Sequence, residues 1–188
     1  MRNNAHMESK EARLARFTNG PPEEAIETLL NSIASYFNNE IALTPMPDNH
    51  QTSLLFLGIH AVALTISEAF FKKSGSDGYK LFLETFIDQL PDNMKFSLVA
   101  KNIHDWRNVL AHQWLGSMGH RINYDYNMSE GWRKDDDGIL KINPKIYCES
   151  YLSAFSSGGK IWSYSNLFTQ SQLEKIKKRI IDKYIKAD

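Results

Sequence analysis

A run of polar side chains interrupts an apolar helical pattern between residues 104 and 114. The segment reads HDWRNVLAHQW and contains two histidines, one arginine and one asparagine. At about 100° per residue, His104, Asn108 and His112 lie along one stripe of a helix, which drifts roughly 40° per step. Arg107 stands five residues before His112, roughly 140° around the helix, so one helix presents this pair on different faces. Two copies of the helix crossing about a two-fold axis would bring both residue types into one cleft. We therefore expect a homodimer.

These residue types suit the cleavage of a phosphodiester without a metal. A histidine that titrates near neutrality can take the proton of a ribose 2′-hydroxyl, which assigns His112 as general base. A guanidinium binds phosphate with paired hydrogen bonds and stabilises the charge that grows on it, which is the role expected of Arg107. The amide of Asn108 can orient either group by hydrogen bonding, and His104 is a candidate supporting residue. Attack by the 2′-oxygen leaves a cyclic phosphate and requires RNA, because DNA lacks this nucleophile.

The segment RNVLAH, residues 107–112, matches an R-x4-H motif with a polar residue directly after the arginine. In this it resembles the higher eukaryote and prokaryote nucleotide-binding (HEPN) superfamily. The setting is also similar, because an earlier apolar helix ends in SEAFFK, residues 67–72, and the motif falls late in a later helix. The resemblance covers residues 26–115.

Membership of this superfamily implies a helical bundle, dimerisation that joins two motifs, and commonly a metal-independent endoribonuclease. Many members are toxins of toxin–antitoxin pairs or phage-defence effectors, so the expected partners are an RNA substrate and an antitoxin or nucleotidyltransferase. Carried over to this chain, the active-site residues are Arg107, Asn108 and His112. Glu68, at a position often acidic in such helices, is a weaker supporting candidate.

The sequence departs from one feature of the family. Some HEPN toxins have a tyrosine two residues after the histidine, and a partner nucleotidyltransferase modifies it. This chain has Gln113 and then Trp114 after His112. Tryptophan has no hydroxyl to accept a nucleotide, so modification at this position is not expected.

The same residues also fit readings without catalysis. Arg107 could form a surface ion pair beside a solvated Asn108, His112 could be a hydrogen-bonded core histidine, and His104 could lie on the helix surface. One alternative function is a non-catalytic HEPN-fold dimer that binds a nucleotide, RNA or a protein partner through the same cleft. A plain helical scaffold without a site is the third reading.

Other side chains that could carry chemistry give weaker signals. No metal site is expected, because ligands on one helix need i, i+4 spacing and His104 and His112 are eight residues apart. No cofactor motif with a glycine-rich phosphate loop is present either. Cys148 is expected to be a packing thiol, and His60 a core histidine with one partner. The segment KIKKRIIDKYIK near the end of the chain has six basic residues opposite its apolar stripe. This segment is the best local candidate for contact with an RNA backbone.

Composition sets broad limits on the class of protein. The 188 residues contain 22 basic and 22 acidic side chains, so no global field favours a nucleic acid or a membrane. A single cysteine excludes an internal disulfide framework and favours a reducing, cytoplasmic setting. We expect no membrane span, because His60 and Glu68 interrupt the longest apolar run.

The spacing of apolar residues predicts a mainly α fold with a small β-hairpin and extra C-terminal helices. The resemblance implies that its core is an antiparallel helical bundle of HEPN type. We expect residues 1–20 to be a flexible N-terminal segment, with a short helix or frayed tail over 8–18, and residues 21–188 to form one domain. Its core is expected over 22–118, the hairpin over 120–143 and the C-terminal helices over 144–188. Helices are predicted near the end of the chain and over residues 22–43, 51–73, 79–90, 92–115 and 144–155, with a connection over 72–78. A strand is predicted over residues 121–128, and residues 139–142 are expected to pair back as a hairpin after a turn at 135–138.

Overall fold

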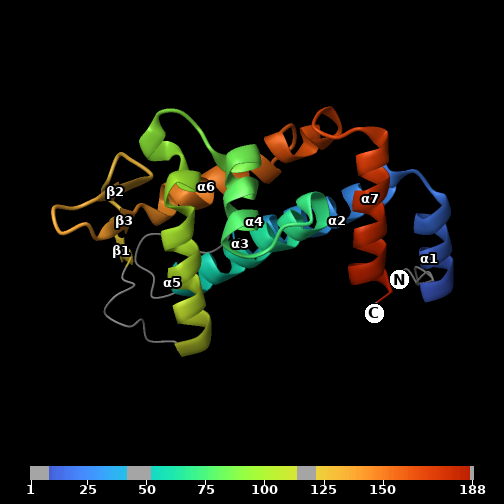
Figure 1. Ribbon diagram of the computed structural model, residues 1–188, viewed down its shortest axis with the longest axis horizontal. Helices are drawn as coiled ribbons and strands as arrows, with labels where there is room; N and C mark the ends of the chain where they lie inside the picture. Colours follow the sequence, from blue (N-terminus) through green and yellow to red (C-terminus); the bar gives the residue numbers. More distant parts are fainter. Residues whose placement is uncertain (1–8, 42–51, 114–121, 187–188) are drawn as a thin grey trace, which may run out of the picture. The chain divides into compact units, whose positions relative to one another are not determined.

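The computed structural model describes residues 9–41, 52–113 and 122–186, and is mainly helical with one small sheet, which confirms the predicted fold class (Figure 1). Two compact units share the chain. The first comprises residues 1–32 and 165–188, and the second comprises residues 33–164. The predicted boundaries at 20, 118 and 143 do not coincide with this division.

The first unit contains helix α1 (Lys10–Asn19), the beginning of α2 (Pro22–Tyr36) and α7 (Gln170–Ile180), which continues as a π-helical turn (Ile181–Ile185). Ser9 caps α1 by accepting a hydrogen bond from the backbone N–H of Ala12. Residues 10–19 are therefore helical, in agreement with the short helix that was one of the two predictions for residues 8–18, and Phe17 is buried. Thr169 and Gln172 form a capping box at the start of α7.

The second unit is built around α3 (Thr52–Ile66), which continues as a π-helical segment (Ser67–Phe71). Around it lie α4 (Gly75–Phe82), which continues to Ile87 as a π-helical segment (Leu83–Ile87), and α5 (Ala100–Gln113). The remaining helical parts are the π-helical end of α2 (Phe37–Ile41), α6 (Pro144–Phe155) and three 3-10 segments (Asp92–Met94, Phe96–Val99 and Lys160–Asn166).

Two helix starts differ from the prediction. Helix α4 begins at Gly75, inside the expected connection, and Gly78 of its first turn fits against the chain so closely that a Cβ there would lie 2.6 Å from the carbonyl oxygen of Lys73. The segment after Pro91 forms short 3-10 turns first, and the α-helix begins only at Ala100. The predicted end of this helix at residue 115 lies outside the described residues.

The sheet has three strands, β1 (Ile122–Tyr124), β2 (Trp132–Lys134) and β3 (Leu140–Ile142), in the order β1-β3-β2. Strands β2 and β3 form the antiparallel hairpin across the turn that the sequence predicted at 135–138. Two parts of the prediction were wrong: β1 is shorter than expected, and it pairs with β3 in parallel rather than as an arm of the hairpin.

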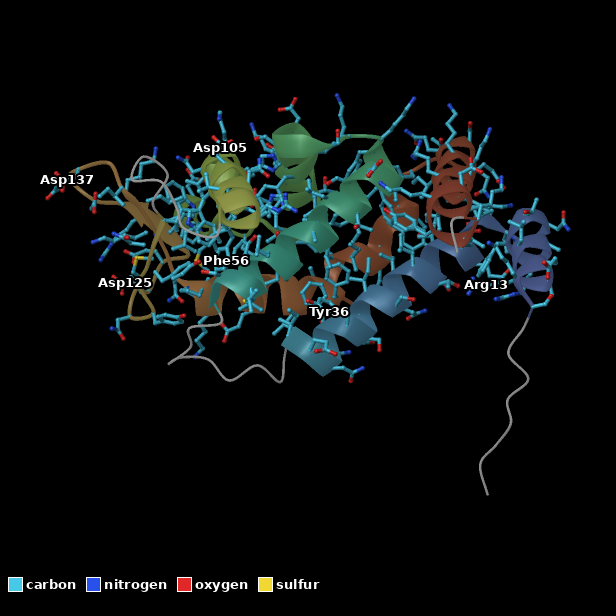
Figure 2. The ribbon with its side chains drawn as sticks, turned by 90° about the horizontal axis from the view of Figure 1, so that it is seen from below. Arg13, Tyr36, Phe56, Asp105, Asp125 and Asp137 are labelled. Carbon is cyan, nitrogen blue, oxygen red and sulfur yellow. The ribbon has the colours of Figure 1, made fainter. Side chains whose placement is uncertain are left out.

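Helices α3 and α5 cross each other (Figure 1), and two side-chain contacts mark where they meet. His60 of α3 lies beside His104 of α5, while Phe56, one turn earlier, packs edge-on against Trp106, with the two ring centroids 5.4 Å apart. Figure 2 shows Phe56 on the inner side of α5 and Asp105 on its outer side. Of the two contacts, the one nearer to residues 107–112 therefore involves the residue nearer to the beginning of α3.

One described helical stretch, Ser53–Phe71, is long and apolar enough to span a membrane by length and composition alone. Half of it is buried in the structure, and the core helix of a soluble protein meets the same criteria. Its contacts with α4, α5 and α6 give it the position of a core helix in the second unit.

Candidate functional site

The predicted site residues Arg107, Asn108 and His112 all lie in the continuous helix α5. Arg107 and Asn108 are half-buried. The side chain of His112 lies outside the part of the chain that the structure describes, so its predicted position beside Arg107 stays a prediction.

The guanidinium of Arg107 is held by its neighbour. Its Nη1 donates a hydrogen bond to Oδ1 of Asn108 over 3.1 Å. Its Nε is buried and has no hydrogen-bond partner among the described residues. No carboxylate of the described residues forms an ion pair with this guanidinium, so the surface ion pair considered from the sequence is not seen there. The only described acid nearby on the same helix, Asp105, pairs instead with Lys101.

A histidine pair joins this helix to α3. Nδ1 of His104 and Nε2 of His60 are 3.1 Å apart, and the ring of His60 also packs on Tyr79 of α4 at 4.2 Å between centroids. His60 is fully buried, which confirms the predicted core histidine with one partner. His104 is half-buried and bonded, so it is not a free surface residue.

Burial keeps both imidazoles uncharged near neutrality. Desolvation is the main cause that lowers the pKa of His60 to about 3, and the charges of His104 and Arg107 lower it further. Desolvation also lowers the pKa of His104; Asp105 opposes the shift, while Arg107 and Lys101 add to it. Two neutral rings therefore lie next to a guanidinium whose charge no described carboxylate balances.

Glu68 lies on the helix that carries His60. It stands eight residues after His60, about 12 Å further along the helix axis at 1.5 Å per residue. The supporting role expected of Glu68 in the site stays a prediction.

The sequence did not predict the contact of His60 with His104. A usable signal was present, because a histidine in a helix that is apolar nearly all round must find a hydrogen-bond partner when it is buried. His104, the histidine nearest the start of the polar stripe, supplies it. The two residues are 44 positions apart in the sequence, so only the packing of α3 against α5 brings them together.

The other groups considered from the sequence are Cys148 and clusters of possible metal ligands. Burial raises the pKa of the Cys148 thiol well above its usual range, which fits a packing cysteine rather than a nucleophile. Within the described residues, no cluster of three or more histidine, cysteine or acidic side chains is placed to hold a metal ion.

One of the six basic side chains predicted to be exposed on the C-terminal helix is buried instead. Lys177 is buried, and its Nζ donates to the backbone carbonyl of Gly20 over 2.7 Å, so it faces the first unit's interior rather than solvent. The exposed basic side chains that remain there include Lys175, Lys178 and Lys186, and the last of these pairs with Asp182.

Comparison of the chain with protein-family models, with curated proteins and with solved structures finds no match. The features that bear on function are therefore the motif and the geometry of α3 and α5.

Proposed function

We propose that the protein is a HEPN-type, metal-independent endoribonuclease that acts as a cytoplasmic homodimer. In this proposal it cleaves RNA by attack of a ribose 2′-hydroxyl on the adjacent phosphate. The family resemblance makes a toxin of a toxin–antitoxin pair or a phage-defence effector the expected biological setting, with an antitoxin or nucleotidyltransferase as a further partner.

One observation carries the proposal: the half-buried guanidinium of Arg107 is oriented by Asn108 and has no ion-pair partner among the described residues. An arginine in a purely structural role normally has its donors satisfied, since an unpaired buried donor costs free energy. A phosphate offers the acceptors that Nε and the remaining Nη hydrogens lack. This supports a site for an anionic group at this end of α5.

The proposed reaction assigns one task to each side chain. The imidazole of His112 accepts the proton of the 2′-hydroxyl, and the 2′-oxygen attacks the phosphorus. The P–O5′ bond breaks, and the 5′-oxygen leaves with a proton taken from solvent or from the protonated histidine of the second motif. Arg107 binds the phosphate and the charge that develops on it, while Asn108 keeps the guanidinium in place. A two-fold axis beside α5 would supply the histidine of one chain to the arginine of the other.

The test is cleavage of end-labelled RNA by the purified full chain in excess EDTA. The proposal predicts products that end in a 2′,3′-cyclic phosphate, and no cleavage of an oligonucleotide with 2′-deoxyribose throughout. His112→Ala should slow cleavage by about 10²- to 10⁴-fold, the usual contribution of a general base. Arg107→Ala should slow it by about 10²- to 10³-fold, the usual contribution of one group that stabilises the transition state.

Lys145→Ala is the control, because it removes one positive charge from an exposed side chain of another helix, α6, where Lys145 pairs with Glu149. It should leave the rate within about threefold of the wild type, as a surface charge contributes little. If the wild-type protein binds RNA but leaves it intact, the non-catalytic alternative replaces the enzyme. If all variants cleave equally well, the site is elsewhere.

A further inference from the structure

The buried pair of histidines has a consequence for the face of α5 that meets the ligand. A neutral imidazole has one N–H and one bare nitrogen, and the bond made by one nitrogen decides the state of the other. The contact between Nε2 of His60 and Nδ1 of His104 uses one proton. The state of either ring therefore determines that of its partner.

The surroundings of His60 select one of the two arrangements. Its Nδ1 is buried and has no partner among the described residues. A buried N–H without an acceptor is rarer in proteins than an acceptor that lacks a donor. Nδ1 of His60 is therefore the bare nitrogen, and Nε2 carries the proton and donates it to His104.

The tautomer of His60 determines that of His104. Its Nδ1 accepts from His60, so its Nε2 carries the proton and is the ring's only free donor. His104 precedes Arg107 by three residues and Asn108 by four, which places the three side chains on one side of α5. Desolvation lowers the pKa of both His60 and His104, and the charge of Arg107 lowers both further. Because His104 stays neutral, this donor persists at physiological pH.

We propose that His104 is a further phosphate-binding residue of the site, donating Nε2–H to a phosphate oxygen of the bound strand, and that His60 is the positioning residue that fixes this tautomer. The inference rests on the proposed function in taking RNA as the ligand. It adds to Arg107 a neutral second donor, which lets α5 bind one phosphodiester from two side chains without a second positive charge.

The first experiment reads the tautomer without any activity. In the full-length protein labelled with ¹⁵N-histidine, long-range proton–nitrogen spectra at neutral pH distinguish a protonated ring nitrogen from a bare one. We expect both His60 and His104 to carry their proton on Nε2. A proton on Nδ1 of His104 would overturn the inference.

The second experiment measures binding of an oligonucleotide with 2′-deoxyribose throughout, which the proposed reaction does not cleave. His104→Leu should weaken binding by about 10- to 100-fold, the usual effect of losing one hydrogen bond to a charged group. His104→Gln keeps an N–H donor and should stay within about threefold of the wild type. Asn102→Leu is the control, since Asn102 is an exposed amide on another face of α5.

These outcomes separate the two proposals. If His104→Leu binds as tightly as the wild type, the phosphate contact does not exist, whatever the protein does to RNA. If binding needs His104 but ordinary RNA remains intact, the contact stands and the enzyme proposal fails.

Discussion

Acid should destabilise this protein through His60 in particular. The ring is fully buried, and its pKa in the folded state is about 3, against 6.5 when it is exposed. The unfolded chain therefore binds a proton on His60 between these values, while the folded chain does not. Stability is fully present above about pH 6.5 and falls as the pH drops toward 3.

The magnitude follows from linkage. Each pH unit below 6.5 removes about 1.4 kcal/mol from the free energy of unfolding, so the loss at about pH 4.5 is about 3 kcal/mol. The assay is urea unfolding followed by circular dichroism, at about pH 7 and about pH 4.5. His60→Gln is neutral at both values, so the wild type should lose about 3 kcal/mol more than this variant.

The same substitution at His104 is the matched control, and the half-buried ring should give a smaller difference. Comparing each variant with the wild type cancels the titration of the carboxylates, which all the proteins share. If the wild type and His60→Gln lose stability in parallel, the reasoning about burial is refuted.

Two further predictions concern the interior of the second unit. The hydroxyl of Tyr147 lies 2.5 Å from that of Tyr79 and 3.2 Å from that of Tyr151, and all three residues are buried. Because Tyr147→Phe removes both hydrogen bonds, it should lower the free energy of unfolding by about 1–3 kcal/mol. Tyr36 is 39% exposed, so Tyr36→Phe should change the free energy of unfolding by less than about 0.5 kcal/mol. Equal losses of stability in the two variants would contradict the importance of the buried hydroxyl network. The buried Cys148 thiol should resist a disulfide reagent in native buffer and react at once in denaturant; rapid labelling of the native protein would show that this thiol is accessible.

The sequence predicted the elements whose signals are local. Pro22 with two following acids begins α2, and the Asn143–Pro144 pair begins α6, because a cap or a fixed φ acts within one helical turn. The turn before β3 was also predictable, since Gly138 has the positive φ of 74° that a tight turn favours.

Contacts between distant segments could not be read in the same way. Residues 75–78 look like a linker, yet they form the first turn of α4, where the carbonyl of Gly78 accepts a hydrogen bond from Ser67. The parallel pairing of β1 with β3 likewise depends on where the chain returns rather than on the alternation within either strand.

The candidate site shows both situations. The spacing of Arg107, Asn108 and His112 placed all three on one helix, and the structure contains that helix. The contact of His60 with His104 depends on how α3 packs against α5. The spacing of a motif determines where its residues lie along one helix, whereas tertiary packing determines which residues of other helices they contact.

The most direct test of the account is the rate of RNA cleavage in EDTA by wild type, Arg107→Ala and His112→Ala, with the products analysed for a terminal cyclic phosphate. The account predicts rapid cleavage by the wild type, cyclic-phosphate ends, and a loss of at least about 100-fold in each variant while both stay folded. Wild-type protein that leaves RNA intact, or variants that cleave as fast as the wild type, would contradict it.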